Sequence, residues 1–138
     1  GDIFIDNDLK YSPDYNLFMK IASVYPVISL NKDFAKYRVH PEALSSKLLK
    51  EVSLDGRVTL DYIFNRFNSN LDGYNSARLA AYQKLNYYDA IYYIDMHDYK
   101  KAKKSIKEVA YTNIFYFILY MLLKSGFKRN FLFKLLNR

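Results

Sequence analysis

The stretch SARLAAYQKLNYYDAIYYIDM, residues 76–96, decides the fold class of this chain. It contains neither glycine nor proline, and large apolar side chains recur every three or four residues at Leu79, Tyr82, Leu85 and Tyr88. That spacing places them on one face of an α-helix, because an α-helix completes a turn about every 3.6 residues. The sequence therefore predicts a long amphipathic helix here.

Two further helices are predicted after this one. Asp98 has a side chain suited to capping the first of them, and Thr112 or Asn113 can cap the second, since short polar side chains accept hydrogen bonds from free backbone N–H groups at helix starts. Gly126 is expected to end the last helix, with Lys124 in its final turn. Beyond residue 73 the chain is thus expected to be helical throughout.

The polar, turn-rich stretch NSNLDG, residues 68–73, is the best internal boundary. It divides the chain into residues 1–69 and residues 70–138. We expect the second part to be a helical-hairpin C-terminal extension.

The first part mixes helix with a small β element. Ser12-Pro13-Asp14 is a strong helix start, and the helix should continue to Pro26 with an apolar face. The members of that face are Leu17, Phe18, Ile21, Ala22 and Tyr25. Residues 26–39 then contain two β-prone runs around a turn-like triplet.

Helix is predicted to resume near Pro41 and to break at Ser53-Leu54-Asp55-Gly56 before a further helix. The fold class that follows is mainly α with a small β element, that is, α+β.

Composition limits the chemistry. The 138 residues include no cysteine, which excludes disulfides, thiolate metal sites and a cysteine nucleophile. His40 and His97 are the only histidines, so a histidine-rich zinc site is excluded as well. Packing must depend on aromatic bulk, because the chain has 15 Tyr and 10 Phe but no Trp.

The net charge of +7 belongs to the C-terminal part. From Lys100 onward there are ten basic residues and a single acid, Glu108. In residues 124–138 the cations alternate with Phe and Leu, a pattern typical of peripheral contact with anionic lipid. A helix that closes the core or meets a partner is the alternative. No nucleic-acid recognition motif accompanies the charge, so we do not expect nucleic acid to bind.

The longest apolar run, Ile114 to Leu123, is too short for a bilayer core, which needs roughly 20 helical residues. The start of the chain has neither the pattern of a signal peptide nor an initiator Met, so we expect a processed or excised piece. The expected location is cytoplasmic, with peripheral membrane contact as an open addition.

Asp6-Asn7-Asp8 is a weak candidate for a metal site. Asp6 and Asp8 follow the apolar run Ile3-Phe4-Ile5 and could hold Mg²⁺ or Mn²⁺, which prefer oxygen ligands. An acidic turn explains the same residues, and we expect it more strongly.

Three further segments occur in a familiar order. IDNDL (residues 5–9) and SPDYNLFMKIA (residues 12–22) are similar to F-D-E-x-L and E-D-Y-D-L-W-x-R-x-A in the acceptor-side segment of family 2 glycosyltransferases. FAKYRVHPEALS (residues 34–45) is similar to the later Y-R-x-H-x-x-S-x-S stretch of that family. The resemblance covers residues 5–46.

The resemblance implies roles for five residues. It makes Asp14 the general base that deprotonates the acceptor hydroxyl. It places Tyr37, Arg38, His40 and Ser45 near the diphosphate of a nucleotide-sugar donor or its metal. A divalent metal, Mg²⁺ or Mn²⁺, is implied for the full-length enzyme and is expected to bind mainly to residues outside this chain.

The chain departs from the family at Pro13 and Asn16, which replace two acids. The nucleotide-binding α/β unit of such enzymes has no counterpart here. We therefore expect a C-terminal fragment of an α/β GT-A type transferase, inactive alone, which exposes apolar surface in residues 1–40 where sheet neighbours belong. Self-association through that surface is an open possibility. Asp14 is otherwise explained as a first-turn acid, and the alternative function is a non-catalytic helical module for protein interaction or membrane docking.

Overall fold

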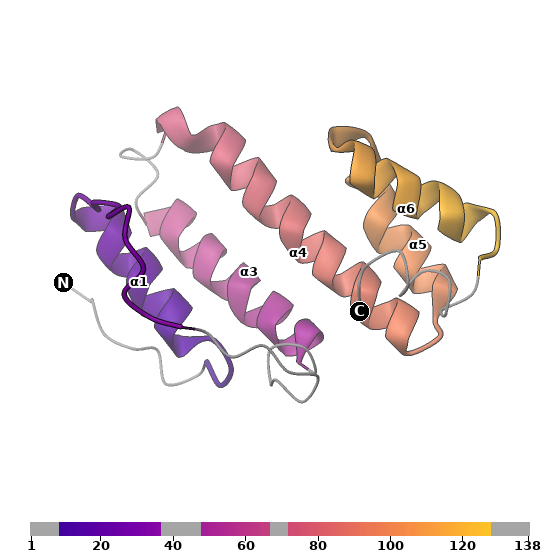
Figure 1. The fold of residues 1–138 in the computed structure, drawn as a ribbon, viewed down its shortest axis with the longest axis horizontal. Helices are drawn as coiled ribbons and strands as arrows, with labels where there is room; N and C mark the ends of the chain where they lie inside the picture. Colours follow the sequence, from indigo (N-terminus) through magenta and orange to yellow (C-terminus); the bar gives the residue numbers. More distant parts are fainter. Residues whose placement is uncertain (1–8, 37–47, 67–71, 128–138) are drawn as a thin grey trace. The chain divides into compact units, whose positions relative to one another are not determined.

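The computed structural model describes residues 9–36, 48–66 and 72–127. The chain forms two compact units, Gly1–Ser76 and Ala77–Arg138. Helices dominate both units, and no strand occurs in the described ranges, so the mainly helical class predicted from the sequence is confirmed (Figure 1).

The first unit is built on two helices, α1 (Pro13–Val24) and α3 (Leu49–Arg66), which pack against each other. They lie side by side and run in the same direction (Figure 1). α1 begins at Pro13, as predicted, because proline fits the first helical position. It ends before Tyr25, whose extended backbone suits a residue that precedes a proline.

The predicted break at Ser53–Gly56 is wrong, because α3 runs through it without interruption. Ser53 and Gly56 are buried together with Leu60 and Ile63, at the spacing of one helix face. Small residues on that face suit packing against a neighbour. Serine and glycine next to an aspartate are typical of a turn in sequence, but here tertiary packing outweighs the local preference.

The small β element predicted for residues 26–39 is not present in residues 26–36, which carry no regular secondary structure; residues 37–39 lie outside the described ranges. Within residues 26–36, one backbone hydrogen bond is present, from the Lys32 N–H to the Leu30 carbonyl, 2.9 Å apart. A strand needs a partner whose backbone groups pair with its own, and the described part of the chain offers none to this segment. In the described residues the predicted β element is therefore absent, and the fold there is mainly α.

The second unit contains α4 (Asn75–Asp95), α5 (Tyr99–Lys107), the short 3₁₀ helix η3 (Ala110–Thr112) and α6 (Ile114–Lys124); another 3₁₀ turn, η2 (Asp72–Tyr74), precedes α4. The long helix predicted for residues 76–96 is thus confirmed to within one residue at each end. The buried apolar side chains of this unit come from α4, α5, η3 with its N-cap residue, and α6; they are Leu85, Ala90, Ile91, Ile94, Ala102, Ile106, Val109, Ala110, Leu119 and Leu123.

The predicted helix caps are also present. The Asp98 carboxylate accepts a hydrogen bond from the Lys101 N–H at 3.0 Å, and the Asn113 side chain accepts one from the Phe115 N–H at 2.8 Å. Gly126, just past α6, has a φ of 80°, the left-handed conformation that glycine adopts most easily. These three residues therefore set the ends of the helices in the second unit.

Aromatic rings of α4 and α6 contact each other. The Tyr87 ring stacks on Tyr116 with centroids 5.4 Å apart and meets Phe115 edge-on at 5.9 Å. The tyrosines of α4 act in packing, as expected of such a spacing. None of the helices in the described ranges is long and apolar enough to cross a membrane.

Removing the Asn113 cap should loosen α6. Asn113→Ala leaves the Phe115 N–H without its side-chain acceptor, which should cost about 1 kcal/mol of local stability. Hydrogen exchange of the α6 amides should then be about fivefold faster. Asn113→Asp keeps an acceptor oxygen, so its exchange rates should stay close to those of the wild type. Equal exchange rates in the wild type, Asn113→Ala and Asn113→Asp would show that Asn113 does not stabilise the start of α6.

The stability of the first turn of α5 should depend on pH. The Lys101 backbone N–H and then its ammonium, 3.0 Å from the carboxylate, lower the pKa of Asp98 below its ordinary value of 3.8. Since the folded value is the lower one, the contribution of Asp98 to stability is complete above pH 3.8 and is lost as the pH falls through the folded pKa. NMR shifts of the α5 amides should follow this loss on acidification.

Asp98→Asn is the matched control for that titration, because the amide oxygen still accepts a hydrogen bond but does not ionise. The same acid-induced change in this variant would show that Asp98 is not its source.

Candidate functional site

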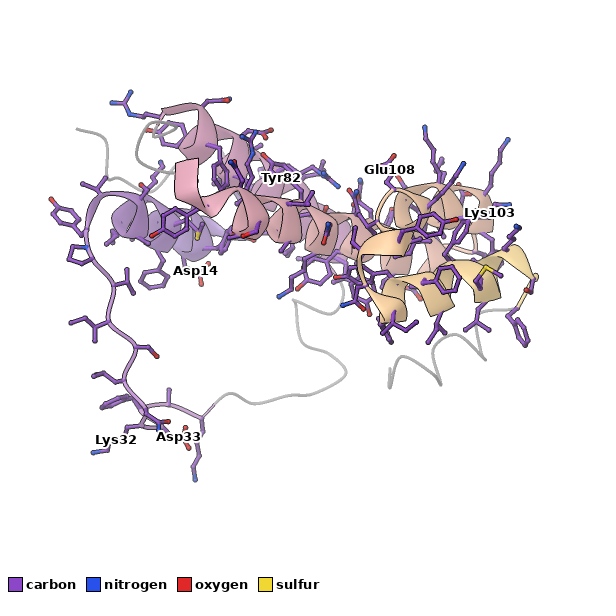
Figure 2. All side chains as sticks on the ribbon, turned by 90° about the horizontal axis from the view of Figure 1, so that it is seen from above. Asp14, Lys32, Asp33, Tyr82, Lys103 and Glu108 are labelled. Carbon is purple, nitrogen blue, oxygen red and sulfur yellow. The ribbon has the colours of Figure 1, made fainter. Side chains whose placement is uncertain are left out.

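Asp14 is the one predicted site residue that lies in the described ranges. Tyr37, Arg38, His40, Ser45, Asp6 and Asp8 all lie outside them. Asp14 is an exposed residue in the first turn of α1, and its Oδ1 accepts a hydrogen bond from the Tyr15 N–H at 2.8 Å (Figure 2). An acid in this position also meets the positive end of the helix dipole.

The start of α1 is held by a carboxylate from the other helix. Asp55 Oδ2 accepts hydrogen bonds from the backbone N–H groups of Tyr11 at 2.9 Å and Ser12 at 3.0 Å. The hydroxyl of Ser12, in the N-cap position, makes no capping bond of its own. Asp55 therefore fixes the backbone just before Asp14, through bonds that are stronger than neutral ones because the acceptor is charged.

One turn further along both helices, two buried side chains pair. The Asn16 Nδ2 group donates to Thr59 Oγ1 at 3.0 Å, and the exposed fractions of the two residues are 1% and 0%. Asn16 Oδ1, also buried, has no hydrogen-bond partner. A buried polar atom without a partner destabilises the fold. The Asn16 side chain therefore depends on its hydrogen bond to Thr59.

A third contact follows after another turn. Lys20 is buried, and its ammonium lies 4.9 Å from the centre of the Tyr62 ring, a cation–π arrangement. We call the three pairs Ser12–Asp55, Asn16–Thr59 and Lys20–Tyr62 the polar ladder. From one pair to the next, the residue numbers in α1 and in α3 both increase, which shows that the two helices run parallel.

The polar ladder turns the predicted apolar face of α1 outward. Ser12, Asn16 and Lys20 face α3, and residues two positions further on lie about 200° around the helix, on the opposite side. That side carries Asp14, followed at intervals of four and three residues by Phe18 and Ile21. Phe18 is 65% exposed and Ile21 is half-buried, so this face lies largely in contact with solvent.

Sequence reasoning missed Asp55 and Thr59, and noticed Asn16 only as a departure from the family pattern. The signal was present as polar residues four apart in two segments, Ser12, Asn16 and Lys20 in one and Asp55 and Thr59 in the other. Polar side chains at helical spacing normally indicate the solvent side, which is why the two sets were not read as partners.

The described residues include no group of three or more acidic, histidine or cysteine side chains that could hold a metal ion. The expected Mg²⁺ or Mn²⁺ was predicted to bind mainly to residues outside this chain, so that prediction is untested.

Comparison of the chain with protein-family models, with curated proteins and with solved structures finds no match. The resemblance of residues 5–46 to family 2 glycosyltransferases therefore stays a prediction.

Loss of the Thr59 hydroxyl should destabilise the first unit. Thr59→Val leaves the buried Asn16 amide without its acceptor, at a cost of about 1–3 kcal/mol. The free energy of opening, measured by hydrogen exchange of the α1 amides, should fall by that amount.

Two controls separate this effect from a general one. Thr59→Ser retains the hydroxyl, and Val58→Thr makes a comparable change at an exposed neighbour, where substitutions normally shift stability by less than about 0.5 kcal/mol. If Val58→Thr were as damaging as Thr59→Val, the ladder would not be the reason.

Proposed function

We propose that residues 1–69 are the acceptor-side part of an inverting glycosyltransferase, in which Asp14 is the general base. The observation that carries this proposal is the position of Asp14: its carboxylate begins the exposed face of α1, and the polar ladder holds the helix from the opposite side. A base must be accessible to the acceptor and must also be held in place, and this arrangement supports both requirements.

The exposed apolar face beside Asp14 supports a protein partner for this unit. Beyond Phe18 it continues through Tyr25 into the segment of residues 26–36, which we call the arm. Ile28 of the arm is 82% exposed and Phe34 70%. The expectation of exposed apolar surface in residues 1–40 is thus confirmed for residues 9–36, and extensive exposed apolar surface usually marks an interaction site.

The backbone of the arm suggests what that partner offers. It has β-prone residues such as Val27 and Ile28, yet its N–H and C=O groups are paired only in the bond from Lys32 to Leu30. A segment of this kind can add a strand to the open edge of a partner's sheet. Its backbone N–H and C=O groups then form hydrogen bonds with those of the partner's edge strand. A nucleotide-binding α/β unit, which the proposal requires, has such a sheet.

The proposed reaction is a single displacement. Asp14 accepts the proton of an acceptor hydroxyl while the hydroxyl oxygen forms a bond to the anomeric carbon of the donor sugar. The bond from that carbon to the nucleoside diphosphate breaks, and the configuration inverts. By resemblance, Tyr37, Arg38, His40 and Ser45 would lie near the departing diphosphate, where cationic and hydrogen-bonding groups offset its charge.

Asp14→Asn tests this proposal in the full gene product that contains residues 1–138. Turnover should fall by about 10²–10⁴-fold, the usual effect of losing a positioned general base. Stability should fall by only about 0.3–1 kcal/mol, because what is lost is one acid at a helix start. The measurements are kcat for sugar transfer, donor affinity, which should hardly change, and melting temperature.

Asp61→Asn, which removes an exposed acid from α3, is the matched control and should leave turnover unchanged. Near-normal turnover in Asp14→Asn with a lowered melting temperature would leave Asp14 as a helix-start acid only. A gene that encodes no α/β unit upstream of Gly1 would favour the alternative, a non-catalytic helical module.

A further inference from the structure

One face of α6 is apolar and exposed, although the helix belongs to the second unit's core. Leu119 and Leu123 are buried, whereas Ile114, Ile118 and Met121 occupy the opposite side of the helix. Ile114 is 73% exposed, Ile118 43% and Met121 40%. We call these three residues the α6 outer face.

Aromatic residues flank this face. Tyr111 precedes α6 and is 79% exposed, while Phe127 follows it and is also exposed. Tyrosine and phenylalanine at the margins of an apolar helix face are typical of helices that lie in the interface between headgroups and acyl chains.

The sequence that follows Glu108 carries charge of one sign. From Val109 to the end of the chain there is no acidic residue, and the basic residues are Lys124, Lys128, Arg129, Lys134 and Arg138. All five follow the apolar run directly in sequence. An anionic surface is therefore the complementary partner for this part of the chain.

We propose that the α6 outer face docks on an anionic lipid surface, with α6 lying along the interface. With 11 residues the helix is only about 16 Å long, which suits a position in the interface and not a crossing of the bilayer. Ile114, Ile118 and Met121 enter the acyl boundary, and Lys124, in the last turn of α6, meets the headgroups.

A second copy of the chain fits the same face less well. Pairing of two α6 outer faces would join two chains that each carry five basic residues and no acid after Glu108. The charge that opposes self-association thus favours lipid.

Binding of the 138-residue chain to vesicles tests the proposal. The chain should bind vesicles of equal parts phosphatidylglycerol and phosphatidylcholine, and bind phosphatidylcholine alone far more weakly. Added salt should weaken the binding, because it screens the charges. Ile118→Ser should lower the partition coefficient about tenfold, since it removes a buried aliphatic side chain from the bound state.

Two matched controls assign the effect to α6. Leu79→Ser makes a similar change at an exposed residue of α4, and Lys103→Glu on α5 changes the net charge as much as Lys124→Glu does (Figure 2). Leu79→Ser should bind as the wild type does, and Lys124→Glu should weaken binding more than Lys103→Glu. Circular dichroism of each variant shows whether the fold is kept.

Three results would overturn the proposal. The first is an absence of binding to anionic vesicles, and the second is equal weakening by Lys103→Glu and Lys124→Glu, which would indicate a general charge effect. The third is a dimer in sedimentation that Ile118→Ser abolishes while vesicle binding is unchanged, which would make the face a self-association surface. None of these results depends on whether Asp14 is a base.

Discussion

The bonds from the backbone of Tyr11 and Ser12 to the Asp55 carboxylate constrain the whole first unit. They begin the polar ladder, and the Asn16–Thr59 and Lys20–Tyr62 pairs continue it at intervals of one turn. A helix that places its asparagine and lysine inward must turn its phenylalanine and tyrosine outward. The exposed apolar face of α1 is thus a consequence of the ladder.

The ladder also sets the register of the two helices. A buried amide or carboxylate without its partner costs more than a misplaced methyl group, so polar pairs tolerate sliding less well than apolar ones. Shifting α1 by one residue would move Asn16 about 100° around the helix, away from Thr59. The polar ladder therefore contributes specificity of arrangement, which in turn determines where Asp14 projects.

The two exposed apolar surfaces of the chain differ in what they can bind. The surface of the first unit includes the arm, whose backbone groups are largely unpaired, and a carboxylate at its beginning. Backbone groups need a polar, directional partner, which a protein sheet supplies and lipid does not. The α6 outer face has its backbone satisfied within a helix and has cations but no acids after it, which suits an anionic interface.

Features that depend on a few neighbouring residues were predictable from the sequence. Pro13 at a helix start, Asp98 and Asn113 as caps, Gly126 past a helix end and the long helix of residues 76–96 were all predictable, because each is governed by local backbone geometry and hydrogen bonding. Asp14 could likewise be placed in a first turn from sequence.

Which helix faces are buried depends on contacts between helices that lie far apart in the sequence. Asp55 is typical of a turn in sequence and acts as an anchor for α1, because its partners are more than 40 residues away. The arm was predicted to form strands, but β structure depends on a neighbour that the described part of the chain does not contain. The inward face of α1 is polar because hydrogen bonds to α3 offset the cost of burying its polar side chains. Neither the spacing nor the hydrophobicity of the residues in α1 reveals those bonds.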